Sequence, residues 1–158
     1  MNKVFRIKIF TCGGTFEKVY NPLSGELTFK NSIMEEMLET SRLRAPTSVE
    51  KLMLIDSLDM NKNHRRRISK KIAADKSNHI ILIHGTDTMV DTAKEINVFR
   101  RDKQIVVLTG AMIPYSVKKS DALFNFGTAI TGLNFVGPGV YIAMNGKIFD
   151  YSKVSKNK

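Results

Sequence analysis

The sequence contains a single cysteine, Cys12, among its 158 residues. That count excludes an internal disulfide, and one thiolate cannot build a cysteine-based metal site by itself. No segment approaches the roughly 18 consecutive apolar residues that a membrane-spanning helix requires. The first ten residues, MNKVFRIKIF, lack the long apolar core and small-residue cleavage site of a secretory signal. We therefore expect a cytoplasmic protein that does not bind membranes.

Histidine is also scarce, with three residues in the chain. His64, His79 and His84 do not stand at ligand spacing from one another or from Cys12. We therefore expect neither a metal ion nor a cofactor.

Positive charge is abundant, since the formal net charge is +10. Basic residues concentrate in the segment 61–76, NKNHRRRISKKIAADK, where Ile68 and Ile72 stand four residues apart. This spacing predicts an amphipathic helix that turns its basic side to solvent. Nucleic-acid binding is the alternative, but no aromatic residue in the segment is available to stack on bases. We expect a solvated face and no nucleic-acid partner.

Short apolar runs alternate with helical patterns along the whole chain. The runs predict strands at 4–10, 51–55, 79–83, 104–109 and 139–144. Helical spacing follows at 32–40, where Ser32 and Glu35 form a capping-box pattern, after residue 88, and from Ser120 onward. Strands that alternate with helices favour right-handed crossovers. The predicted fold is α/β, with a doubly wound, mainly parallel sheet and helices on both faces in three layers, forming one domain over residues 1–158.

In open parallel sheets, binding sites lie beyond the carboxyl ends of the strands. The segments there read TCGGTFEK (11–18), DSLDMN (56–61), HGTDTM (84–89), TGAMIP (109–114) and MNGKIF (144–149). They bring glycines, hydroxyls and carboxylates to one edge, which suits a small polar substrate. The CGGT segment could also be only a tight turn, and Ser57 and Asp59 could simply cap the next helix. His84, at a strand end, is more typical of a packed, hydrogen-bonded histidine than of a base.

Taken together, several segments resemble, in order, the signatures of the bacterial-type L-asparaginases. They are FTCGGTFEKVYNPLSGEL, DSLDMN, HGTDTM, VVLTGAMIP, SDALFN and GVYIAMNGKIF. The resemblance runs from about residue 5 to the C-terminus. Long members carry a second, smaller α/β domain that is absent here, so the chain is similar to a short, single-domain branch.

The resemblance implies hydrolysis of L-asparagine to L-aspartate and ammonia through a threonine nucleophile. It assigns catalytic roles to Thr15, Tyr20, Thr86, Asp87 and Lys156, the last from the segment VSKN. The expected substrate-binding residues are Gly14, Ser57, Thr86, Asp87 and Ala111.

A threonine hydroxyl needs a nearby base, for which Lys156 is the candidate. A carboxylate favours the charged form of a neighbouring ammonium. Asp87 is therefore expected to orient Lys156 or to hold the substrate ammonium. Ser57 is expected to bind the substrate α-carboxylate. Backbone N–H groups near Gly14, Thr15 or Ala111 are expected to stabilise an oxyanion, and Tyr20 to act from a mobile loop.

Some features leave alternatives open. Glu17 stands where an aspartate is expected, and the acidic residue that long members receive from a neighbouring subunit has no counterpart. Glutamine turnover is therefore expected to be weak.

Thr15 is favoured over Thr86 as the first nucleophile. The alternative function is an amino-acid-binding or sensor module without turnover, and the resemblance implies a homodimer or a dimer of dimers.

Overall fold

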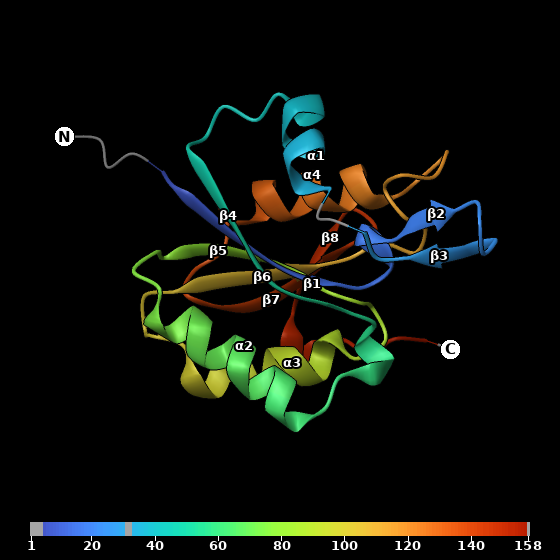
Figure 1. Cartoon of the computed structure of the whole chain (residues 1–158). Coiled ribbons are helices and arrows are strands. Elements are labelled where there is room, and N and C mark those ends of the chain that lie inside the picture. Colours follow the sequence, from blue (N-terminus) through green and yellow to red (C-terminus); the bar gives the residue numbers. More distant parts are fainter. Residues whose placement is uncertain (1–4, 31–32, 158) are drawn as a thin grey trace.

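The structure is a computed structural model, and it describes residues 5–30 and 33–157. Its centre is a six-stranded sheet with the order β4-β1-β5-β6-β7-β8 (Figure 1). The strands are β1 (Ile7–Gly13), β4 (Thr47–Ile55), β5 (His79–Ile83), β6 (Ile105–Thr109), β7 (Gly139–Met144) and β8 (Lys147–Asp150). The first five strands in this order run parallel, and β8 pairs antiparallel with β7. The predicted mainly parallel α/β sheet is confirmed.

Helices cover both faces of the sheet, as Figure 1 shows. The helices α1 (Met34–Ser41) and α4 (Ala122–Gly132) lie on one face, and α2 (Lys62–Ala74) and α3 (Met89–Phe99) lie on the other. The three-layer, doubly wound prediction is therefore confirmed.

None of the helices in the described part of the chain is both long and apolar enough to cross a membrane.

Alternate residues of each strand enter two separate cores, because successive side chains of a strand point to opposite faces. Ile81 and Ile83 pack against α1 and α4, whereas Ile80 and Leu82 pack against α2 and α3. All four are fully buried. The predicted burial of this strand on both faces is confirmed.

Several predicted boundaries and caps differ from the structure. The first strand begins at Ile7 and continues through Gly13, because it pairs with β4 on one side and β5 on the other. Val4 and Ser32 lie outside the described residues, so the capping box at Ser32 cannot be compared. Asn61 caps α2 together with His64, so Ser57 and Asp59 do not cap that helix. They form instead a short 3-10 helix, η2 (Ser57–Asp59).

Two segments contain elements that were not predicted. The segment after β1 begins with a 3-10 helix, η1 (Thr15–Glu17), and continues as a hairpin of β2 (Val19–Asn21) and β3 (Glu26–Thr28). Near the other end, β8 follows a two-residue turn at Asn145 and Gly146, both with positive φ. Positive φ at both positions is characteristic of tight hairpin turns, for which Asn-Gly is a favoured pair. A 3-10 helix, η3 (Tyr151–Lys153), then leads to the last described residues.

His84 lies at the end of β5 and is fully buried. Its ring Nδ1 lies 2.7 Å from the Gly85 carbonyl oxygen, and its Nε2 lies 2.7 Å from the Thr92 hydroxyl. Burial lowers the pKa of His84 from 6.5 to about 4, and nearby Arg65 acts in the same direction, whereas the bond to Gly85 opposes it. His84 is therefore a neutral, hydrogen-bonded core histidine, the interpretation that the sequence favoured.

We predict that His84 makes stability depend on pH in acid. Between pH 6.5 and 4 the unfolded chain binds a proton at this residue that the folded chain does not, so the free energy of unfolding falls as pH falls. The expected contribution lost over this window is about 3 kcal/mol. Urea unfolding of the wild type and of His84→Gln at a series of pH values checks this. The advantage of the wild type over His84→Gln in the free energy of unfolding should shrink as pH falls. A difference that stays constant would contradict the lowered pKa of His84.

Candidate functional site

The strand order places a topological switch point between β1 and β5. The chain leaves β1 toward β4 on one side, and it leaves β5 toward β6 on the other. Neighbouring loops that depart in opposite directions open a crevice at the carboxyl ends of their strands. The two loops at this point are Gly14-Thr15 and the segment 84–88.

The two loops touch through their glycines. A Cβ on Gly14 would lie 2.5 Å from Gly85 Cα, and a Cβ on Gly85 would lie 2.6 Å from the Ser57 side chain. Gly14 also has a φ of 69°, which side chains rarely tolerate. Glycine is thus required at both positions, and Thr15, Thr86 and Ser57 all adjoin this contact.

Two hydrogen bonds fix the start of the Thr15 loop. Gly13 N–H donates to Glu17 Oε2 at 2.7 Å, and Gly14 N–H donates to the Ile55 carbonyl at 2.9 Å. Glu17 is fully buried, so its extra methylene relative to the expected aspartate is accommodated inside the fold. Thr15 itself is half-buried, and its hydroxyl makes no hydrogen bond to a described residue. Its oxygen is available to a substrate.

Lys156 joins the site from the far end of the chain. Its Nζ donates to Thr86 Oγ1 at 2.9 Å and to Asp87 Oδ1 at 2.6 Å. The Lys156 and Asp87 side chains are 32% and 42% exposed, so this ion pair faces the crevice. Thr86 accepts from Lys156 and turns its own hydrogen toward Met112 Sδ, 3.7 Å away. The structure therefore brings Lys156 into contact with two other predicted residues, Thr86 and Asp87, which lie 70 and 69 positions earlier in the chain.

Ser57 lies at the floor of the crevice. It is fully buried, and its Oγ has no hydrogen-bond partner among the described residues. A buried hydroxyl without a partner is energetically unfavourable, which is typical of a position where a ligand or water completes the bonding. Thr88 Oγ1 donates to the Ser57 carbonyl at 2.8 Å, so the Asp87 loop and η2 are fixed to each other.

The other two predicted site residues lie further from the ion pair. Ala111 is buried at the carboxyl end of β6, beside exposed Met112. Tyr20 lies on the β2–β3 hairpin, with 61% of its surface exposed, and its hydroxyl has no hydrogen bond to a described residue. No hydrogen bond within the described part of the chain links Tyr20 to Thr15 or Lys156.

Sequence inspection missed the contacts that hold the loops. Asp56 accepts from Leu58 N–H and from Lys18 Nζ, the latter at 2.7 Å, so it ties η2 to the base of the hairpin. The bond from Lys18 lowers the pKa of Asp56. Asp121 accepts the Met112 and Ile113 amides and so orders the loop after β6. Only the three-dimensional arrangement identifies these partners, although an aspartate before a short helix is a recognised cap.

A cavity of about 400 Å³ opens beside the ion pair. Thr86, Met112 and Lys156 line it together with six other apolar residues and with the polar residues Asn145, Ser155 and Asn157. Among the described residues, no group of three histidine, cysteine, aspartate or glutamate side chains could hold a metal ion. The polar groups that the two loops and Lys156 bring together are hydroxyls, the Lys156 ammonium and the Asp87 carboxylate. This set suits binding and hydrolysis of a small charged amide.

We predict that Gly14→Ala separates the two loops. The new methyl group would meet backbone atoms of Gly85, which cannot move aside as a side chain could. The expected loss of stability is roughly 2–5 kcal/mol, from overpacking and positive φ together. The matched control is Gly25→Ala, with φ of 73° and nothing within 4 Å of its Cβ, which should lose only about 1 kcal/mol. Equal losses by denaturant unfolding would contradict the close contact.

Comparison with known proteins supports the same family. Residues 6–158 match the model of the family "Asparaginase, N-terminal". An L-asparaginase of Thermococcus kodakarensis is 40% identical over 85 residues, covering 53% of this chain and 26% of the relative. The "Probable L-asparaginase periplasmic" of Haemophilus influenzae is 30% identical over 138 residues, covering 84% of this chain and 39% of the relative. The chain thus spans less than half the length of these relatives.

Solved structures give the same result. A probable cytoplasmic L-asparaginase from Campylobacter jejuni has a TM-score of 0.81 and 31% identity, with 96% of this chain and 49% of that chain covered. The thermostable L-asparaginase from Thermococcus kodakarensis has a TM-score of 0.79 and 27% identity, with 91% and 45% covered. The fold, the switch-point loops and these matches agree, and the chain belongs to the asparaginase family, of which it corresponds to the N-terminal domain.

Proposed function

We propose that the chain forms the hydrolytic site of an L-asparaginase, converting L-asparagine to L-aspartate and ammonia. The observation that carries this proposal is the hydrogen bonding of Lys156 Nζ to both Thr86 Oγ1 and Asp87 Oδ1 at the switch point. The names of the relatives support the substrate class.

In the proposed complex, Ser57 Oγ donates to the substrate α-carboxylate, and Asp87 accepts from the α-ammonium. Ser57 lies against Gly85, and Asp87 follows Gly85 by two residues, so together they would hold the backbone end of asparagine in the crevice. The side-chain amide would then extend toward Thr15 and Thr86. Backbone N–H groups at Gly14, Thr15 or Ala111 would stabilise the oxyanion of the tetrahedral intermediate.

We propose that Thr15 Oγ attacks the amide carbon when the hairpin closes. Its proton passes to the hydroxyl of Tyr20, which at the same time gives its own proton to a water molecule, so Tyr20 acts as a neutral relay. The hairpin has strands of three residues each and forms a separate two-stranded sheet, an arrangement of low intrinsic stability. Closure of such an element over a site is a common way to complete a catalytic centre.

Loss of ammonia needs a proton on the leaving nitrogen. Thr86 can give its hydroxyl proton to that nitrogen, because its oxygen already accepts from Lys156 and its hydrogen points away from the lysine. A proton from Lys156 then replaces it on Thr86. In the second half-reaction, water attacks the acyl-threonine, and one of its protons passes through Thr86 to the neutral amine of Lys156. When the bond to Thr15 then breaks, the remaining proton of the attacking water moves to Thr15 Oγ, which restores the hydroxyl and releases aspartate as the carboxylate.

We infer that this domain acts in the cytoplasm and that it forms homodimers or dimers of dimers. The names of the relatives support both cytoplasmic and periplasmic locations. An apolar hollow of about 650 Å³ on α4, beside Phe124 and Phe135 with 63% and 83% exposure, supports self-association.

The test is release of ammonia and aspartate from L-asparagine by the purified chain, with L-glutamine alongside. Thr15→Ala should abolish release, and Lys156→Ala should lower kcat by at least about 100-fold, the usual contribution of general acid–base catalysis. Lys153→Ala is the matched control, because Lys153 is exposed and lies three residues before Lys156. Its kcat should stay close to that of the wild type.

Wild-type protein that releases no ammonia, yet melts at a higher temperature with asparagine, would contradict the enzymatic proposal. It would support the binding or sensor module instead. Equal losses in Lys153→Ala and Lys156→Ala would contradict the specific role of Lys156.

A further inference from the structure

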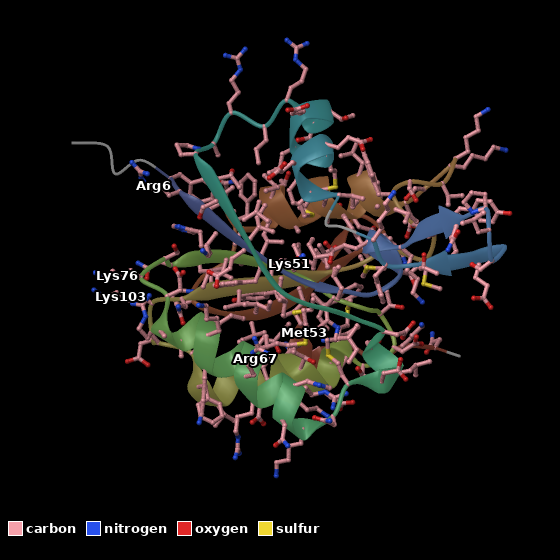
Figure 2. All side chains as sticks on the ribbon, in the orientation of Figure 1. Arg6, Lys51, Met53, Arg67, Lys76 and Lys103 are labelled. Atoms are coloured by element: carbon pink, nitrogen blue, oxygen red, sulfur yellow. The ribbon has the colours of Figure 1, made fainter. Side chains whose placement is uncertain are left out.

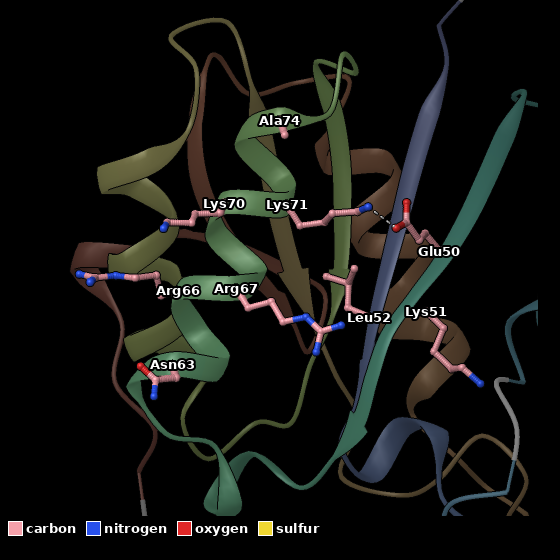
Figure 3. A pocket seen from close by; sticks show the side chains of 9 residues that line it. All are labelled: Glu50, Lys51, Leu52, Asn63, Arg66, Arg67, Lys70, Lys71 and Ala74. Carbon is pink, nitrogen blue, oxygen red and sulfur yellow. Dashed lines mark ion pairs between the residues drawn. The ribbon is translucent and has the colours of Figure 1, made fainter.

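A groove lies between α2 and the outermost strand β4 (Figure 3). Its volume is about 640 Å³. Its lining residues include five basic side chains, one acidic side chain and an apolar floor. They are Glu50, Lys51, Leu52, Asn63, Arg66, Arg67, Lys70, Lys71 and Ala74. We call it the α2–β4 groove.

The positive charge of this groove is only partly neutralised. Its one carboxylate, Glu50, is shared by Lys71 at 2.8 Å and Lys8 at 3.0 Å, and these two ammonium groups lower the pKa of Glu50. By contrast, Arg67 makes no ion pair within the described part of the chain. Figure 3 shows Arg67 and Lys71 extending from α2 toward β4, whereas Arg66 and Lys70 point to the other side of the helix.

The strand that borders the groove has an open edge. β4 is nine residues long and stands at the end of the sheet order, with β1 as its neighbour on the inner side. Among residues 5–30 and 33–157, no strand pairs with its outer side. Such an edge presents backbone N–H and C=O groups that can pair with an added extended chain. Lys51 is exposed on this strand and points to the opposite side of the sheet from Arg67 (Figure 3).

The spacing of the two cations matches that of an added strand. Arg67 and Lys71 are four residues apart on one helix, which separates them by about 6 Å along its axis. Alternate residues of a strand point to one face and are about 6.6 Å apart. Acidic residues at alternate positions of a strand beside β4 would therefore meet Arg67 and Lys71 in turn.

We propose that the α2–β4 groove binds an extended acidic segment of a partner protein, added as a further strand along β4. Main-chain hydrogen bonds to the open edge supply affinity, and alternate carboxylates on Arg67 and Lys71 supply specificity. Leu52 and Ala74 receive the apolar parts of the segment. Nucleic acid is the less suitable partner, because no aromatic side chain lines the groove for base stacking.

The test measures binding of a short fluorescent peptide in which glutamate alternates with valine and threonine. Arg67→Gln with Lys71→Gln should weaken binding roughly tenfold, as expected for the loss of two part-exposed ion pairs. The matched control is Arg44→Gln with Lys118→Gln, which removes the same charge at two exposed positions outside the groove. It should change the affinity less than twofold, and melting temperatures establish that both variants fold.

Strand addition has a second signature, because only every other amide of a strand faces its neighbour. N-methylation of one alternate set of peptide amides should abolish binding, and methylation of the other set should be tolerated. No peptide binding, equal losses in the two variants, or equal tolerance of both methylated peptides would each overturn the proposal. Tighter binding of single-stranded oligothymidylate that is lost in Arg67→Gln with Lys71→Gln would replace it with a nucleic-acid interface.

Discussion

The backbone contact between Gly14 and Gly85 is the constraint on which the site depends. A Cβ on Gly14 would lie 2.5 Å from backbone atoms of Gly85, so a side chain there would push the two loops apart; a Cβ on Gly85 would lie 2.6 Å from the Ser57 side chain and would displace η2. The contact lies where the chain leaves β1 and β5 in opposite directions, with fully buried residues of both strands packed below. Thr15 and Thr86 follow the two glycines directly. The rigid sheet thereby fixes two hydroxyls at one crevice.

Charge at the crevice is organised around this contact. Lys156 arrives after β8 and η3 and donates to Thr86 and Asp87, whereas Lys18 and Asp56 tie the hairpin base to η2. The neutral, buried His84 hydrogen-bonds to the Gly85 carbonyl within the loop after β5 and adds no charge to the crevice. A second concentration of positive charge lies on α2, which borders the α2–β4 groove. Figure 2 shows Arg67 on this helix and Lys51 on the neighbouring strand β4. The proposed hydrolysis and the proposed partner binding would thus use separate surfaces of one fold.

Much of the fold could be predicted because the buried strands are continuous apolar runs. β5 and the strand predicted at 139–144 fall where the sequence indicated. The polar start of β4, from Thr47 to Glu50, was missed because it has no apolar run. The β2–β3 hairpin was missed because its strands are short and partly exposed, and β8 because its Asn145-Gly146 turn was overlooked. Motifs located Thr15, Thr86 and Asp87, but only tertiary structure shows that Lys156 reaches Thr86.

The most direct test of the central claim identifies the residue that carries the acyl group. Rapid acid quenching during turnover of L-asparagine, followed by peptide mass mapping, would trap that intermediate. An aspartyl adduct on the peptide containing Thr15, absent in Thr15→Ala, is the result expected if the glycine contact presents Thr15 to the substrate amide. An adduct on Thr86, or steady turnover by Thr15→Ala, would contradict it.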